Sequence, residues 1–159
     1  DWYRTPVELG WANRISLNHE FYGKEALAAL KKAPPRTLVT LVWNEEDVMD
    51  VAASMFRDEE QYDYMELPRT QWYSNHADKV LDGGKVIGIA TNRIFSQYFR
   101  KTISHCSIDT EYAQMGREVV VVWGEPGHRQ KHIRATVAPS PFKEDNRYID
   151  LHNMPKELK

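Results

Sequence analysis

The sequence has little of several features that define whole classes of protein. Cys106 is its one cysteine, which excludes an internal disulfide and favours a reducing compartment. No N-x-Ser/Thr glycosylation site occurs. No apolar run approaches the roughly 18 residues of a membrane span, and the N-terminus has no signal-peptide pattern. We therefore expect a cytoplasmic protein that neither crosses nor anchors in a membrane.

Charge of one sign is also missing, because 21 basic residues face 23 acidic ones and the net charge is −2. This balance supplies no broad cationic field for nucleic acid or anionic lipid, so we expect no nucleic-acid partner. Apolar residues make up 42% of 159 residues, enough for one ordinary domain with a packed core. The chain opens on Asp1 and two aromatic residues, an opening more typical of the middle of a protein. We expect a fragment of a longer chain.

The first part of the sequence predicts two helices and a strand. Good helix formers run from Tyr22 to Lys32 and end before Pro34-Pro35. The β-branched and apolar run Arg36–Trp43 then predicts a buried strand. Asn44 and the acids after it predict a capped helix that packs on the sheet. Its packing face is expected to hold apolar residues at three-to-four spacing: Val48, Met49, Ala52, Met55 and Phe56.

Strands dominate the rest of the chain. After an irregular stretch from Asp58 to Asn75, with a possible short strand near Tyr64–Leu67, an Asp-Gly-Gly turn predicts a hairpin over Lys79–Ile89. Three more strands are expected near 102–108, 118–123 and 132–137. The charged tail, 143–159, should cover the surface or fray.

Most candidate functional motifs are weak. His128 and His132 have zinc-ligand spacing for a helix, but the surrounding pattern predicts a loop and a strand, so no metal site is expected. His105 and Cys106 are adjacent on a predicted strand and point to opposite faces, so they cannot form a nucleophile–base pair. No phosphate-loop pattern follows Gly83-Gly84.

Glu8 has two interpretations. Thr5, Pro6 and Glu8 form a capping-box pattern, in which the carboxylate holds the backbone N–H of the cap residue. The spacing alone favours this structural role over a ligand-binding role. A ligand-binding role for Glu8 needs support from outside the spacing.

That support is a resemblance. Thr5-Pro6-Val7-Glu8 with Gly10-Trp11, followed by Phe21-Tyr22-Gly23-Lys24-Glu25-Ala26-Leu27, resembles the signature of the glycine-cleavage T-protein (aminomethyltransferase) family. The stretches 39–44, 78–88, 112–119, 122–125 and 133–139 are most similar to the branch of tetrahydrofolate-dependent vanillate and syringate O-demethylases. The resemblance covers about residues 3–142. Residues 89–97 depart from the Thr-Ser-Gly…Ser-Pro segment of T-proteins, which argues against a simple aminomethyltransferase.

The resemblance implies a strand-rich α+β fold. Residues 1–35 would end a T-protein-like folate-binding lobe, 36–142 would form a distorted antiparallel β-barrel, and 143–159 would be a surface tail. It implies tetrahydrofolate as cofactor, with Glu8 hydrogen-bonded to the pterin ring and Trp43 packed against the folate. The remaining lobes and the catalytic residues would belong to a missing N-terminal part, so no catalytic residue is assigned in this chain.

The leading hypothesis is the C-terminal piece of a tetrahydrofolate-dependent one-carbon transferase, inactive alone, that moves a methyl group from a methoxy or related donor. The first alternative is a non-catalytic folate-sensing or protein-interaction module. The second is the tail of a flavin-dependent sarcosine- or dimethylglycine-type dehydrogenase, which would carry a dinucleotide-binding fingerprint upstream.

Overall fold

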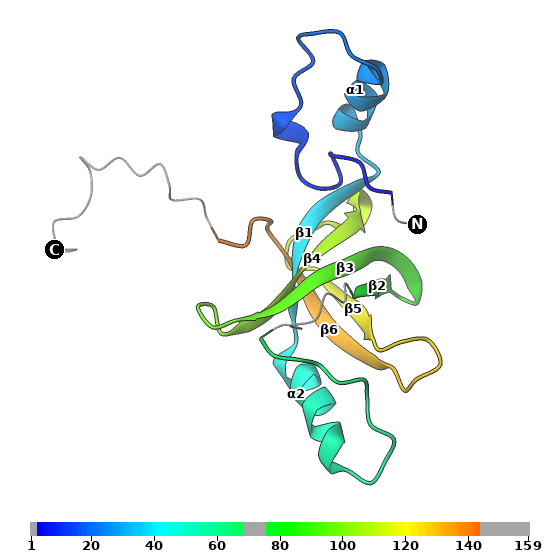
Figure 1. Ribbon diagram of the computed structural model, residues 1–159, viewed down its shortest axis with the longest axis vertical. Coiled ribbons are helices and arrows are strands. Elements are labelled where there is room, and N and C mark those ends of the chain that lie inside the picture. The colour runs from blue at the N-terminus through cyan, green and yellow to red at the C-terminus, as the bar shows by residue number, and fades with distance from the viewer. Residues whose placement is uncertain (1–2, 69–75, 144–159) are drawn as a thin grey trace, which may run out of the picture.

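The computed structural model describes residues 3–68 and 76–143, and these build a closed six-stranded antiparallel barrel with a helical segment at each end (Figure 1). The strands are β1 (Arg36–Trp43), β2 (Ala77–Asp82), β3 (Lys85–Ser96), β4 (Lys101–Asp109), β5 (Glu118–Trp123) and β6 (Lys131–Ala138). Their order around the barrel is β1-β4-β3-β2-β5-β6, and β6 pairs with β1 to close it. The predicted strand-rich α+β fold with a barrel is confirmed.

The barrel interior is filled by alternate residues of each strand, as a period of two requires. On β4, Thr102, Ser104, Cys106 and Ile108 are buried, whereas Lys101 and His105 are exposed. The core combines these positions with apolar side chains of the other strands: Val39, Leu41, Trp43, Val80, Ile87, Ala90, Val119, Val121, Trp123, Ile133, Ala135 and Val137.

The close approach of β3 to β4 explains why residue 88 is a glycine. Gly88 on β3 lies where a Cβ atom would stand 2.7 Å from the backbone oxygen of Ser107 on β4. Such an approach leaves no room for a side chain, so glycine is required there for packing. The predicted hairpin turn is also present, since Gly83 and Gly84 have φ of 53° and 86° between β2 and β3.

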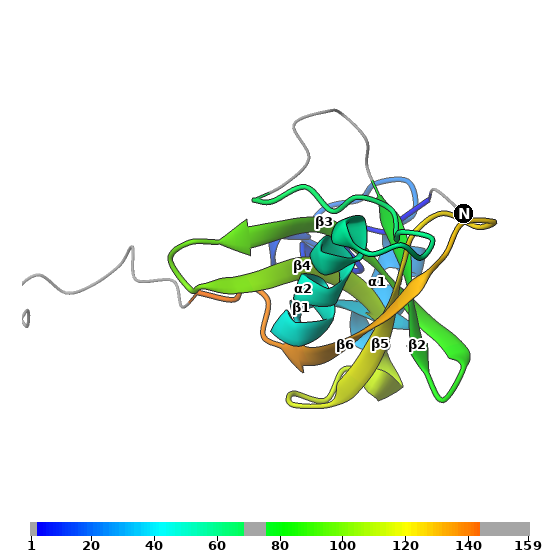
Figure 2. The ribbon, with the colours of Figure 1, turned by 90° about the horizontal axis from the view of Figure 1, so that it is seen from below.

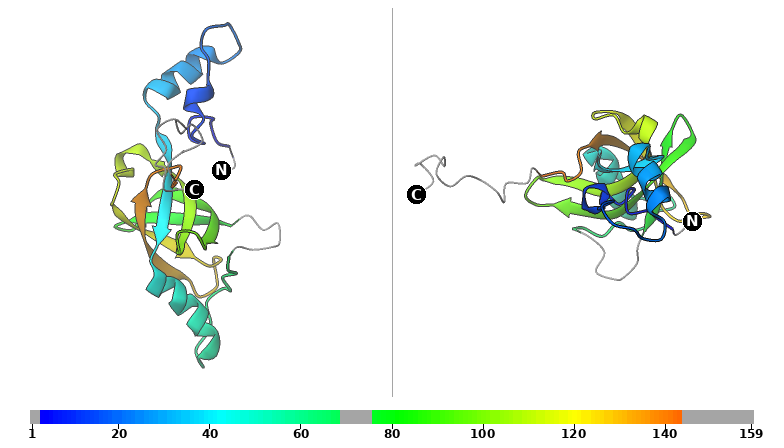
Figure 3. Two further views of the ribbon diagram at one scale, coloured as in Figure 1. Left: turned by 90° about the vertical axis from the view of Figure 1, so that its left-hand side faces the viewer. Right: turned by 90° about the horizontal axis from the view of Figure 1, so that it is seen from above.

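The helix α1 (Lys24–Lys32) and the turn at residues 6–10 lie at one end of the barrel, and α2 (Glu45–Ala53) lies at the other (Figure 3). Among the described residues, no helix is long and apolar enough to cross a membrane. None of the residues of α1 is buried. The Ala and Leu side chains of α1 lie on one face of the helix. An amphipathic helix normally buries its apolar face against a core, and the described residues do not bury this one.

The helix α2 begins as predicted, since the Asn44 side chain accepts a hydrogen bond from Asp47 N–H at 3.0 Å. Seen from that end, α2 lies in front of the barrel (Figure 2). Its predicted packing face is wrong in part. Val48 and Val51 are buried and Ser54 follows them in the short 3-10 helix Ser54–Phe56, whereas the apolar residues Met49, Met55 and Phe56 are exposed.

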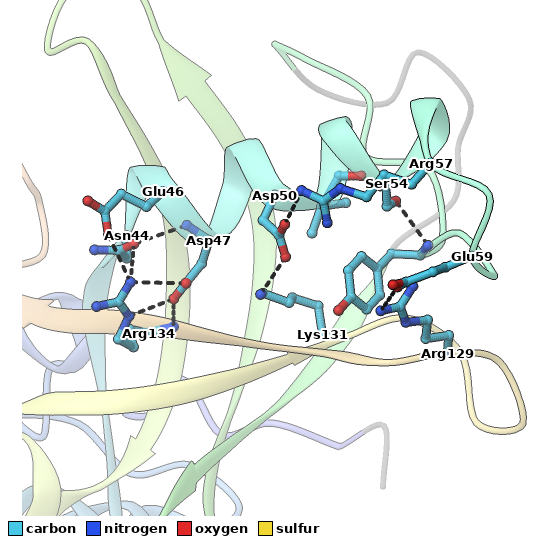
Figure 4. Close-up of polar contacts among 12 residues, drawn as sticks. Asn44, Glu46, Asp47, Asp50, Ser54, Arg57, Glu59, Arg129, Lys131 and Arg134 are labelled. Carbon is cyan, nitrogen blue, oxygen red and sulfur yellow. Dashed lines mark hydrogen bonds and ion pairs between the residues drawn. The ribbon is translucent and has the colours of Figure 1, made fainter.

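Polar side chains decide which face of α2 contacts the barrel. Lys131 on β6 donates to Asp50, and Arg134 on β6 contacts Asp47, so the helix is turned with its acidic edge toward this strand (Figure 4). Ser54 Oγ donates to the Val51 oxygen and accepts from Tyr62 N–H, which joins the helix to the stretch after it.

The stretch after α2 contains no strand at Tyr64–Leu67, because these residues pair with none of the barrel strands in a ladder. Asp63 accepts hydrogen bonds from Glu125 N–H and contacts His128, and its backbone oxygen accepts from the Trp123 indole at 2.8 Å. The predictions for residues 69–75 and for the tail beyond residue 143 lie outside the described residues.

Candidate functional site

Glu8 makes the capping box that its spacing predicts. Thr5 N–H donates to Glu8 Oε2 at 2.7 Å, and Glu8 N–H donates to Thr5 Oγ1 at 3.2 Å. The residues that follow form a turn rather than a regular helix, with Leu9 N–H bonded to the Thr5 oxygen. The reciprocal pair therefore fixes the turn itself.

The same carboxylate keeps one oxygen available for a ligand. Glu8 is buried, with 9% of its surface exposed, yet no hydrogen bond from the described residues reaches Oε1. A carboxylate has two oxygens, each able to accept hydrogen bonds. The structural role occupies Oε2, so it does not exclude a second role for Oε1.

Trp43 is the last residue of β1 and lies inside the barrel. Only 3% of its surface is exposed, its Nε1 donates to Ser104 Oγ at 2.9 Å, and its ring meets Trp123 edge-on at 6.2 Å between centroids. These contacts satisfy the indole without any ligand, which is the core role that a buried tryptophan normally has.

A shallow pocket of about 220 Å³ opens beside Trp43, at the N-terminus of α2. It is lined by residues of β1, β4, β5 and β6 and by the helix start: Val42, Trp43, Asn44, Glu45, Lys101, Glu118, Arg134, Ala135 and Thr136. The lining is mainly polar.

Arg134, the main cation of this pocket, is already paired. Its Nε and Nη2 donate to the two Asp47 carboxylate oxygens at 2.9 and 3.0 Å, and Nη2 also reaches Glu46 (Figure 4). The hydrogen bond from Arg134 lowers the pKa of Asp47 and so keeps the carboxylate charged. This bidentate pair anchors α2 on the barrel. The sequence marks Arg134 only as an outward residue of an alternating strand.

The structure does not bring Glu8 and Trp43 together. The position of a Cβ on Gly10, two residues after Glu8, would lie 3.2 Å from Leu38 near the start of β1, whereas Trp43 ends that strand. Five residues of extended strand separate Leu38 from Trp43, which is about 16 Å. A shared role of Glu8 and Trp43 at one folate stays a prediction.

Two other candidates have structural roles. Cys106 is fully buried between strands, and burial raises the pKa of its thiol to about 12, so it is no nucleophile. His105 points outward, as the strand alternation predicts. His128 Nδ1 lies 2.8 Å from Asp63 Oδ1 in a loop, while His132 is on β6.

The profile of the glycine cleavage T-protein C-terminal barrel domain matches residues 64–143. The chain belongs to the glycine cleavage T-protein family. It is 43% identical to the sesamin methylene transferase of Sinomonas sp. (strain No.22), over 96% of this chain and 36% of that protein. It is 34% identical to the syringate O-demethylase of Sphingobium sp., over 87% of this chain and 32% of that protein.

More distant relatives of this T-protein barrel include the aminomethyltransferase of Listeria welshimeri, 30% identical over 87% of this chain and 31% of that protein. A solved structure, the glycine cleavage system aminomethyltransferase T of Bartonella henselae, aligns with a TM-score of 0.49 and 21% identity, over 88% of this chain and 32% of that one. The chain thus spans about a third of the length of the curated relatives it matches. The family resemblance and its demethylase branch are confirmed.

Proposed function

We propose that this chain is the C-terminal part of a tetrahydrofolate-dependent one-carbon transferase that takes a methyl or methylene group from an aryl ether. Two relatives support the reaction class, since a methylene transferase and an O-demethylase both act on one-carbon units. The observation that carries the folate assignment is Glu8, a buried carboxylate with one oxygen held by its own turn and the other available.

The chemistry of Glu8 fits a pterin. A carboxylate accepts hydrogen bonds from amino and ring N–H donors that lie in one plane, and charge-assisted bonds of this kind are the strong ones. The Thr5 bond fixes the rotamer of Glu8 in advance, so less side-chain freedom is lost on binding. Tetrahydrofolate supplies the nitrogen that accepts the one-carbon unit, and Glu8 in this proposal only orients the ring.

Trp43 has a weaker claim to the folate. Its indole N–H is satisfied by Ser104 inside the barrel, and Trp43 lies at the α2 end of β1, whereas the turn that holds Glu8 lies at the other end. In our proposal Trp43 acts through the barrel, as a side chain that shapes the core behind the pocket.

The rest of the catalytic machinery would come from a larger protein. Tyr22 and Trp11 are exposed beside the unburied α1, and the chain covers about a third of its relatives. We propose that additional lobes cover this surface and supply the acid and the donor pocket. Catalysis would then depend mainly on holding donor and acceptor in line.

The test is isothermal titration of tetrahydrofolate into the longer protein and its Glu8→Gln variant. The glutamine oxygen can still accept from Thr5 N–H, so the substitution keeps the turn and removes the charge. We expect an affinity loss of more than tenfold, about 1.5 to 3 kcal/mol, with an unchanged melting temperature.

Glu20→Gln is the matched control, because Glu20 is an exposed partner of Lys24 in the same region. It should bind folate normally. Equal affinity of the Glu8→Gln variant and the unmodified protein would restrict Glu8 to its turn. No folate binding by the unmodified protein would favour the non-catalytic protein-interaction module.

A further inference from the structure

A buried carboxyl lies at the end of the barrel that Trp43 and Trp123 close. Asp78 on β2 has 8% of its surface exposed and shares the inward face of the strand with Val80. Among the described residues no hydrogen bond reaches its carboxyl, and burial raises its pKa to about 7. A carboxyl in this setting is stable when neutral and costly when charged.

The Arg93 guanidinium lies near Asp78 and has one donor without an acceptor among the described residues. The register of β3 against β4 shifts between Thr91 and Ile94, and Asn92 has a φ of 54°. A bulge of this kind redirects the side chain that follows it. The Arg93 guanidinium lies over the Trp123 ring, 5.1 Å from its centroid, and its buried Nη1 has no hydrogen-bond acceptor in the part of the chain that the structure describes.

Asp78 and Arg93 influence each other electrostatically without forming an ion pair. Each shifts the pKa of the other, yet among the described residues the two form no ion pair within 4.0 Å. Burial lowers the pKa of Arg93, while Asp78 opposes that effect. The guanidinium therefore remains the charged partner, and only the carboxyl changes state near neutral pH.

We propose that Asp78 and Arg93 form a proton-linked switch in which the guanidinium rests on Trp123 while Asp78 is protonated, and Nη1 pairs with the Asp78 carboxylate after ionisation. The Arg93 Nη1 donor lacks an acceptor and the ionised Asp78 carboxylate would lack a donor, so a hydrogen bond between them would satisfy both groups. The attraction between their charges is strong where water is excluded. Leaving the ring gives up the cation–π contact, which is the opposing force.

Other charged groups of the described residues face this pair. Glu125, in the loop after β5, disfavours ionisation of Asp78, and Glu66 stabilises the charge on Arg93. The His76 ring lies 5.2 Å from the Trp123 ring between centroids, tilted by 43°, and its Nδ1 lies 3.9 Å from Glu125 Oε1. Because His76 contacts the same indole, the test must separate His76 from Asp78.

The test is an NMR titration of the 159-residue chain from about pH 5.5 to 8.5. It follows the carboxyl carbon of Asp78, the Arg93 Nε–H and the Trp123 indole N–H, which the Trp123→Phe variant assigns. We expect all three signals to move together with one midpoint, near pH 7. Separate midpoints, or an indole signal that stays constant, would refute the switch.

Two variants separate Asp78 from His76. Asp78→Asn mimics the protonated state, so it should fold and abolish the indole transition, whereas His76→Phe keeps an aromatic ring beside Trp123 and should retain the transition. The reverse pattern would assign the transition to His76 and overturn the proposal. Arg93→Gln removes the moving group, so the indole should stop responding while the Asp78 midpoint rises, because Arg93 lowers that pKa. An unchanged midpoint there would also contradict the switch.

Discussion

The hydrogen bond between Trp43 and Ser104 gives the sharpest test of whether Trp43 is a core residue. Both side chains are buried, at 3% and 2% exposure, and the indole N–H has Ser104 Oγ as its acceptor. The Ser104→Ala substitution removes this acceptor but little volume. It leaves a buried donor unsatisfied, so the expected loss of unfolding free energy is about 1 to 3 kcal/mol.

The effect should depend on the tryptophan. In a Trp43→Phe background no donor is left unsatisfied, so adding Ser104→Ala should cost only a few tenths of a kcal/mol. The coupling energy of this double-mutant cycle is then about 1 to 2 kcal/mol. Urea unfolding, followed by far-ultraviolet circular dichroism, measures all four proteins.

Equal costs of Ser104→Ala in the two backgrounds would refute the reasoning, because the indole would then not depend on Ser104. Titration of tetrahydrofolate into the same longer variants separates the two roles of Trp43. A Trp43→Phe protein with normal stability and weakened folate binding would show that Trp43 is a folate contact.

Two further predictions concern packing and charge. Gly88→Ala should lower the unfolding free energy, measured in urea, by about 1 to 3 kcal/mol, because its Cβ would lie 2.7 Å from the Ser107 backbone oxygen. A cost as small as that of Val86→Ala, at an exposed position, would contradict this. Asp47→Asn should destabilise the protein at pH 7, because the Arg134 hydrogen bond holds the pKa of Asp47 below 3.8 in the folded protein. The charged Asp47 therefore stabilises the fold fully above pH 3.8, and this contribution is lost as the pH falls through the folded pKa. Urea unfolding at pH 7 and at about pH 2 checks it, and a difference that persists in acid would exclude this cause.

The capping box shows how far a sequence pattern can reach. Thr5 and Glu8 are three residues apart, and their hydrogen bonds connect neighbours in the chain, so spacing was enough to predict them. The turn at Gly83-Gly84 is equally local, since it depends on the freedom of glycine to adopt positive φ. The ligand role of Glu8 depends on a molecule outside the chain, and it stays a prediction.

The face of α2 shows where the same reasoning fails. A helical period marks Met49, Met55 and Phe56 as apolar but does not say which side of the helix meets the barrel. Asp47 and Asp50 settle this by pairing with Arg134 and Lys131, more than 80 residues later in the chain. Those partners become neighbours only when β6 closes the barrel against β1.

The sequence by itself determined the strands, the turns and the family, because alternation, glycine placement and short motifs act over a few neighbouring residues. Tertiary structure alone decided that Trp43 lies in the core and away from Glu8, and that Asp78 and Arg93 share a buried end of the barrel. Each of these depends on strand order and register, and a bulge in β3 re-aims the arginine. Burial then sets the charge of a group, and burial is a property of the closed barrel rather than of any single strand.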